Sequence, residues 1–86
     1  MTTVITKMYV PDYERWAQQF EAGAESRKAF GIVILAHGHD ASDANIAIVI
    51  AQMEADKVRE INENPILQEN LRKEGIKQLE LTVIEG

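Results

Sequence analysis

Two histidines lie two residues apart near the middle of the chain, and they are the side chains best suited to acid–base chemistry. His37 directly follows an apolar run, and His39 lies within a segment of turn-forming residues. Because the ordinary pKa of histidine is roughly 6.5, an imidazole can take a proton from an activated phenol or from a carbon next to a carbonyl. We therefore single out His37 as a candidate general base. The alternative is a half-exposed histidine at a strand end, hydrogen-bonded to the loop.

The same pair, His37 and His39, could offer two imidazoles to one metal ion, with a carboxylate from Asp40 or Asp43. That arrangement needs the strand to continue past His37, but Gly38 and the turn-forming residues after it argue against this, and no third histidine exists. We predict no metal site and keep the two histidines as weak candidates. The absence of cysteine excludes disulfides, thiolate ligands and thiol nucleophiles.

Apolar and aromatic residues recur at spacings of three and four over residues 13–29, which predicts a helix with one apolar face. Its aromatic residues can pack the helix onto a sheet, line a pocket, or do both. The predicted ligand-binding residues are Met8, Tyr13, Trp16, Phe20 and Leu71. Arg27 is the last residue of this face. Its positive charge is favourable near the C-terminus of a helix, and its aliphatic stem can run along the surface. Alternatively, Arg27 anchors an anionic substrate, although we expect it at the opposite pole from His37.

The elements that must position these residues follow a regular order. Strands are predicted at 2–10, 32–36, 46–53 and 78–84, and the last alternates Leu79, Leu81 and Val83 inward with Gln78 outward. Helices are predicted at 13–29 and 55–74, with a kink or restart at Asn64-Pro65. Residues 38–45 are predicted to be a loop that joins the second and third strands in a hairpin. The chain is therefore one α+β domain over residues 1–86.

Two βαβ units with right-handed crossovers give a ferredoxin-like βαββαβ fold. It has a four-stranded antiparallel sheet, both helices on one face, and strands one and three in the middle. The other face would be bare, yet residues 32–36 and 46–51 are apolar at every position. Soluble monomers rarely expose such a patch, so we predict a homodimer closed through this face of the sheet.

Net charge and hydropathy argue against nucleic acid and membranes as partners. Fourteen acidic residues against nine basic ones give a net charge of −5, and the basic residues are scattered, so nucleic acid is not expected as a partner. The longest apolar run, residues 46–51, is far short of the roughly 20 residues that cross a bilayer. We expect no membrane association and place the protein in the cytoplasm.

Four short motifs carry a resemblance to a known superfamily. They are Val10-Pro11-Asp12-Tyr13-x-x-Trp16-x-x-x-Phe20, Arg27-x-x-x-Gly31, Asn64-Pro65-x-Leu67 and Glu74-Gly75-Ile76. With the order of elements, they resemble the dimeric α+β barrel superfamily, and most closely the small proteins grouped with antibiotic-biosynthesis monooxygenases and polyketide cyclases. The resemblance covers nearly the whole chain, and its matching residues are mostly structural.

The resemblance implies a pocket between helices and sheet in each subunit. It also implies a cofactor-independent monooxygenase or cyclase acting on a small aromatic or polyketide-like molecule, with His37 carried over as the pocket histidine. Related haem-degrading enzymes ligate iron through a helical histidine, which both predicted helices lack, so no cofactor is expected. The alternative is a non-catalytic ligand-binding or assembly module, because the core offers one base and no obvious acid beside it.

Overall fold

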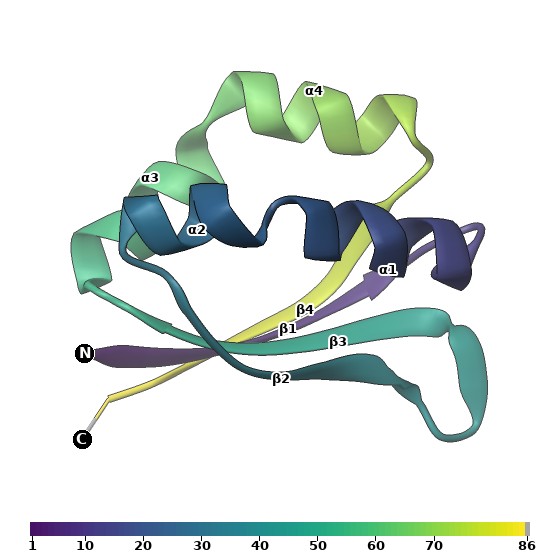
Figure 1. Cartoon of the computed structure of the whole chain (residues 1–86), viewed down its shortest axis with the longest axis horizontal. Coiled ribbons are helices and arrows are strands. Elements are labelled where there is room, and N and C mark those ends of the chain that lie inside the picture. Colours follow the sequence, from purple (N-terminus) through teal and green to yellow (C-terminus); the bar gives the residue numbers. More distant parts are fainter. Residues whose placement is uncertain (86) are drawn as a thin grey trace.

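The chain folds in the order β-α-β-β-α-β, with each helical segment divided into two helices (Figure 1). The computed structural model describes residues 1–85. Its elements are β1 (Thr2–Tyr9), α1 (Tyr13–Ala22), α2 (Ala24–Phe30), β2 (Val33–Asp40), β3 (Asp43–Met53), α3 (Ala55–Glu63), α4 (Pro65–Lys73) and β4 (Lys77–Ile84).

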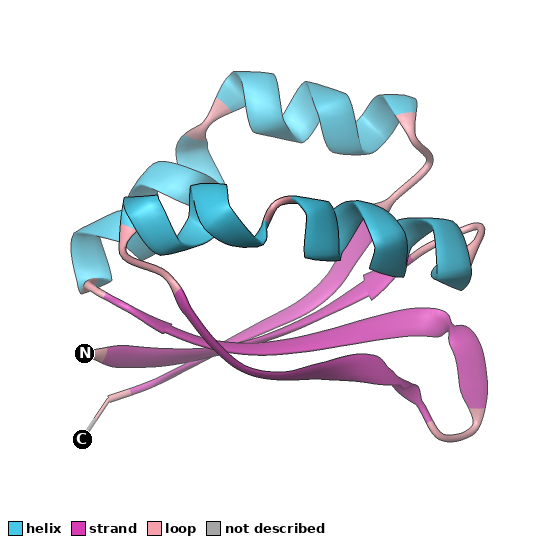
Figure 2. Ribbon diagram, viewed as in Figure 1, coloured by secondary structure: helices cyan, strands magenta, loops and turns pink. Residues whose placement is uncertain are grey.

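The four strands form one antiparallel sheet in the order β2-β3-β1-β4, so β3 and β1 are central. All four helices lie on one face of this sheet (Figure 2). We call that face the inner face and the opposite one the outer face. The predicted fold class, a ferredoxin-like α+β sheet with helices on one side, is confirmed.

Capping residues explain where the helices begin and end. The side chain of Asp12 accepts a hydrogen bond from the Arg15 backbone N–H at the start of α1, and that of Asn64 accepts from Ile66 and Leu67 at the start of α4. The predicted restart at Asn64-Pro65 is confirmed. The predicted continuous helix over 13–29 is wrong, because Gly23 separates α1 from α2.

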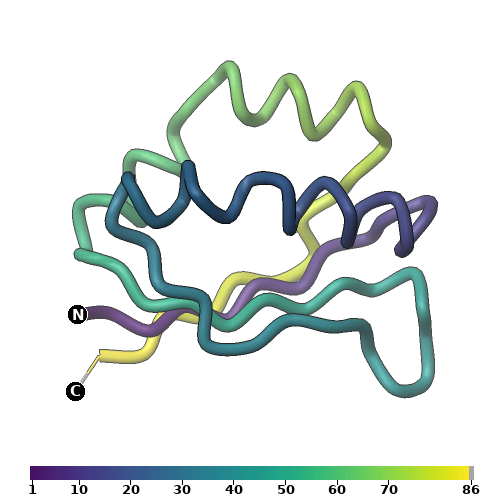
Figure 3. Tube along the Cα trace, viewed as in Figure 1, coloured from purple at the N-terminus to yellow at the C-terminus, as the bar shows by residue number. Residues whose placement is uncertain are grey.

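The predicted loop over residues 38–45 is also wrong. The β2 strand runs on to Asp40 and β3 begins at Asp43, so only two residues turn the hairpin. The Asp40 carboxylate accepts from the backbone N–H and hydroxyl of Ser42, and these bonds lower the pKa of Asp40. Local hydrogen bonds of this kind let turn-forming residues close a tight hairpin between long strands. The hairpin curls away from the helices at its tip (Figure 3).

Three register shifts interrupt the strand pairing: one lies at the hairpin, between His39 and Asp40, and the other two change which side chains face inward. The register between β2 and β3 shifts between Ile34 and Ala36, and the register between β1 and β4 shifts between Lys7 and Met8. Each of these two shifts inserts an extra residue and reverses the alternation beyond it. As a result Gln78 pairs with Met8 on the inner face, whereas Leu79, predicted to point inward, is half exposed.

The core lies between the inner face and the helices. Its buried apolar residues are Val4, Val10, Trp16, Ala47, Val49, Ala51 and Met53. The outer face carries exposed apolar side chains, which include Tyr9, Val33 and Ile84. Within residues 1–85, the helices are all too short or too polar to cross a membrane.

Candidate functional site

A cavity of about 430 Å³ lies between the inner face of the sheet and the helices. We call it the central cavity. Its wall is mostly apolar and includes four of the predicted ligand-binding residues, Met8, Trp16, Phe20 and Leu71. The fifth, Tyr13, is not part of this wall, because its ring packs against Trp16 and His39 instead. A few polar side chains complete the wall: Thr6, Gln19, Arg27, Asn62, Gln68, Glu74 and Gln78.

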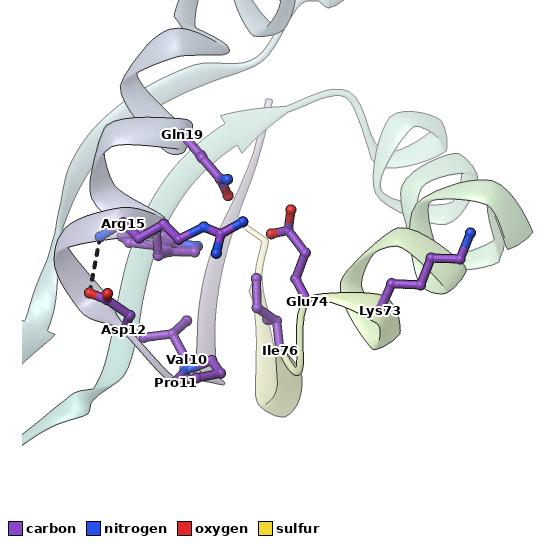
Figure 4. Close-up of a pocket in the computed structure, with 9 residues that line it drawn as sticks. Val10, Pro11, Asp12, Arg15, Gln19, Lys73, Glu74 and Ile76 are labelled. Carbon is purple, nitrogen blue, oxygen red and sulfur yellow. Dashed lines mark hydrogen bonds between the residues drawn. The ribbon is translucent and has the colours of Figure 1, made fainter.

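A smaller pocket of about 210 Å³ lies beside the central cavity, between the start of α1 and the connection from α4 to β4. We call it the polar mouth. It shares Trp16, Gln19, Glu74 and Ile76 with the central cavity. The side chains of Arg15, Gln19 and Glu74 converge there, whereas Lys73 points away (Figure 4). Sequence reasoning missed these polar residues, because they lie among charged surface positions with no distinctive spacing.

A third hollow of about 490 Å³ runs along the edge strand β2, under α1 and α2. We call it the edge groove. Phe20, Arg27, Ile32 and Ile34 line both the edge groove and the central cavity, so they form the wall between the two. His37 lines the edge groove and not the central cavity.

The strand irregularity in β2 brings His37 to the inner face. We expected His37 to share a face with Val33 and Leu35, but that is wrong, because the register shift after Ile34 lies between them. His37 pairs with Val49, a core residue, while Val33 and Leu35 are exposed. The His37 ring centroid lies 4.9 Å from that of Phe20, and the imidazole is otherwise exposed. Neither Tyr13 nor Trp16 lines its groove.

Five rings form a continuous row with a histidine at each end. The ring centroids are 4.8 Å apart for His39 and Tyr13, 5.6 Å for Tyr13 and Trp16, and 4.9 Å both for Trp16 and Phe20 and for Phe20 and His37. The two histidines therefore contact different rings, and His39 Nδ1 lies 2.9 Å from the Asp40 carbonyl oxygen. Across residues 1–85, no three histidine, aspartate or glutamate side chains gather as a metal site would need.

Arg27 lies beside the same phenyl ring. Its Nη2 donates to the Phe20 carbonyl oxygen, and its Cζ lies 3.8 Å from the Phe20 ring centroid. Burial lowers the pKa of Arg27. Sequence reasoning put Arg27 and His37 at opposite poles, whereas both line the edge groove. The spacing of seven residues already placed Phe20 and Arg27 on one helical face, but no pattern in the sequence linked that face to His37.

Fold and cavity together define a small ferredoxin-like α+β domain with a mostly apolar site between its helices and its sheet. A solved structure with the same fold, from Deinococcus radiodurans, is described as a "putative antibiotic biosynthesis monooxygenase". It superimposes with a TM-score of 0.65 at 12% identity, over 100% of this chain and 92% of that one. The chain belongs to the family described as Domain of unknown function (DUF3764), whose model matches residues 1–85. No curated protein matches the sequence.

Proposed function

We propose that the protein is a homodimer in which each subunit binds a small aromatic or polyketide-like molecule in the central cavity. The observation that carries the proposal is the cavity itself. Its volume of about 430 Å³ falls within the range of roughly 300–1,000 Å³ typical of small-molecule sites. Its wall combines aromatic and aliphatic side chains with a few polar groups, which is the composition that orients an apolar ligand.

The outer face supports the homodimer. Ile5, Ile48 and Ile50 occupy its centre, and Ile50 pairs with Ile5 on one side and Ala36 on the other. Val33 at 47% and Ile84 at 49% exposure extend the apolar surface toward both edges. A second copy placed face to face would remove this surface from water, which is the main favourable term in association.

Two readings of the activity remain open to experiment. A cofactor-independent monooxygenase or cyclase is favoured by the description of the structural neighbour and by His37, which lines the edge groove beside the cavity wall. A non-catalytic ligand-binding module is favoured by the exposure of His37 and by the lack, within residues 1–85, of an ion pair between its ring and a carboxylate. The cytoplasmic location and the lack of a cofactor stay predictions.

Trp16 provides a direct test of ligand binding. It is the one tryptophan in the sequence, it is 7% exposed, and it lines the central cavity. A screen of one- to three-ring phenols and hydroxynaphthoquinones should yield compounds that quench its fluorescence and raise the melting temperature. Ala51 is buried and lines the cavity, so the larger side chain of Ala51→Leu should fill part of the site and weaken binding of those compounds by about tenfold or more.

The matched control is Ala29→Leu, because Ala29 is an exposed alanine of α2 outside the cavity wall. It should bind the same compounds as the wild type. Equal binding by Ala51→Leu and Ala29→Leu would place the ligand outside the central cavity and contradict the proposal. Any compound that binds is then incubated aerobically with the protein, and product formation is followed by mass spectrometry to separate an enzyme from a binding module.

A further inference from the structure

Arg27 is a charged side chain in a mostly apolar wall, and the carboxylates that line the same two hollows, Glu21 in the edge groove and Glu74 in the central cavity, form no ion pair with it among the described residues. Within residues 1–85 it makes no ion pair, and its single hydrogen bond goes to the Phe20 carbonyl oxygen. Its Nε is buried and has no hydrogen-bond partner among the described residues. Leaving a buried donor of a charged group unpaired is costly, so such a group in a native structure calls for an explanation.

The position of the guanidinium is set by its surroundings. A Cβ atom at Gly23 would lie 2.9 Å from Nη1, so the glycine that separates α1 from α2 also provides the space for this group. The Phe20 ring lies against the guanidinium, and the Phe20 carbonyl orients Nη2. The charge is therefore fixed in the wall between the central cavity and the edge groove before any ligand arrives.

We propose that the ligand carries an acidic oxygen on an apolar body, and that Arg27 binds this anion. This inference rests on the proposed function and specifies its ligand class: an aromatic or polyketide-like carboxylate, enolate or phenolate. Nε is enclosed and Nη2 uses one N–H on the Phe20 carbonyl, so the guanidinium can offer an anion the remaining N–H groups of Nη1 and Nη2. Such charge-assisted hydrogen bonds give both affinity and orientation. Phe20, Ile32 and Ile34, which border both hollows, would contact the apolar body.

The position of His37 would let the anion site take part in proton abstraction. His37 lines the same groove as Arg27, and both contact Phe20. If the imidazole takes a proton from a phenol or from a carbon next to a carbonyl, the electron pair stays on the substrate as a phenolate or enolate. Arg27 would then stabilise the negative oxygen, as fixed donors do where charge develops.

The test compares 2-naphthoate with 2-naphthalenemethanol, which share one ring system and differ in charge. Calorimetric titration of the wild type should show naphthoate binding about tenfold or more tighter, the range of one charge-assisted hydrogen bond. In Arg27→Gln this preference should disappear while naphthalenemethanol still binds. Lys28→Gln is the matched control, because Lys28 lines the same groove and its loss changes the charge equally. It should keep the preference.

Each other outcome overturns the inference. Equal binding of both probes by the wild type leaves the cavity proposal standing and removes the anion site, whereas binding of neither probe removes both. If the preference for naphthoate survives in Arg27→Gln, or is lost in Lys28→Gln, the anion is bound by a residue other than Arg27. If Arg27→Gln does not fold, Arg27→Met replaces it, because Met keeps an apolar stem against Phe20 and removes the charge; an unchanged preference in that variant overturns the inference in the same way.

Discussion

The Val49→Asp variant is expected not to fold, whereas Ile50→Asp is expected to fold and to remain a monomer. The two residues are neighbours on β3 and point to opposite faces of the sheet. Val49 is 8% exposed and belongs to the core under the helices, so a carboxylate there would be buried without a partner. That costs several kcal/mol, comparable with the roughly 5–15 kcal/mol that stabilises a domain.

Ile50 lies on the outer face between Ile5 and Ala36, where it is partly exposed in the single chain. In the proposed dimer, two-fold symmetry packs the same apolar face of both copies together. A charge at Ile50 would therefore be buried against the apolar face of the second copy. Light scattering should give twice 9.7 kDa for the wild type and 9.7 kDa for Ile50→Asp. Circular dichroism should show native secondary structure for Ile50→Asp and its loss for Val49→Asp.

The control for added charge is Ser26→Asp, because Ser26 is exposed on α2, away from both faces of the sheet. It should fold and dimerise like the wild type. If Ile50→Asp fails to fold, Val33→Glu gives the same information, since Val33 is 47% exposed and its replacement disturbs the single chain little. A wild-type protein that is monomeric at micromolar concentration contradicts the proposed dimer.

Local signals predicted most of the fold. Asn64-Pro65 predicted the restart of the second helical segment, because the Asn64 side chain caps the new helix and Pro65 has a backbone angle that suits its first turn. Gly31 predicted the end of the first segment, because a glycine that ends a helix often adopts a positive φ, and the φ of Gly31 is 89°. Alternating apolar residues predicted the strands for the same reason: each of these patterns depends on a few neighbouring residues.

The details that depend on pairing between strands were not predictable. The face to which His37 belongs is decided by the register shift after Ile34, and such a shift reflects contacts with β3 rather than any local pattern. Simple alternation placed His37 with Val33, which lies on the outer face, and with Leu35, which is the unpaired residue at the shift. The edge groove was missed for a related reason, because Arg27 and His37 come to line one groove only when α1 and α2 lie over β2 in the folded chain.

Loss of the His37 imidazole is expected to lower turnover by about 100-fold or more, the usual contribution of a general base, if the protein is an enzyme. His37→Ala should fold normally, because the side chain is exposed and its one ring contact is with Phe20. Its affinity for cavity ligands should change little, since His37 is not part of the central cavity wall. The measurement is kcat with any aromatic compound that the wild type converts.

His39→Ala is the matched control, because His39 is the one other histidine and contacts Tyr13 at the opposite end of the aromatic row. It should keep nearly full turnover. The Arg27→Gln variant should lower kcat as well, since the anion left by proton removal would lose its partner, whereas Lys28→Gln should not. If His37→Ala and His39→Ala both turn over like the wild type, the imidazole is not the base. A bound ligand that no variant converts would favour the binding module, with Arg27 selecting the ligand and His37 merely bordering its groove.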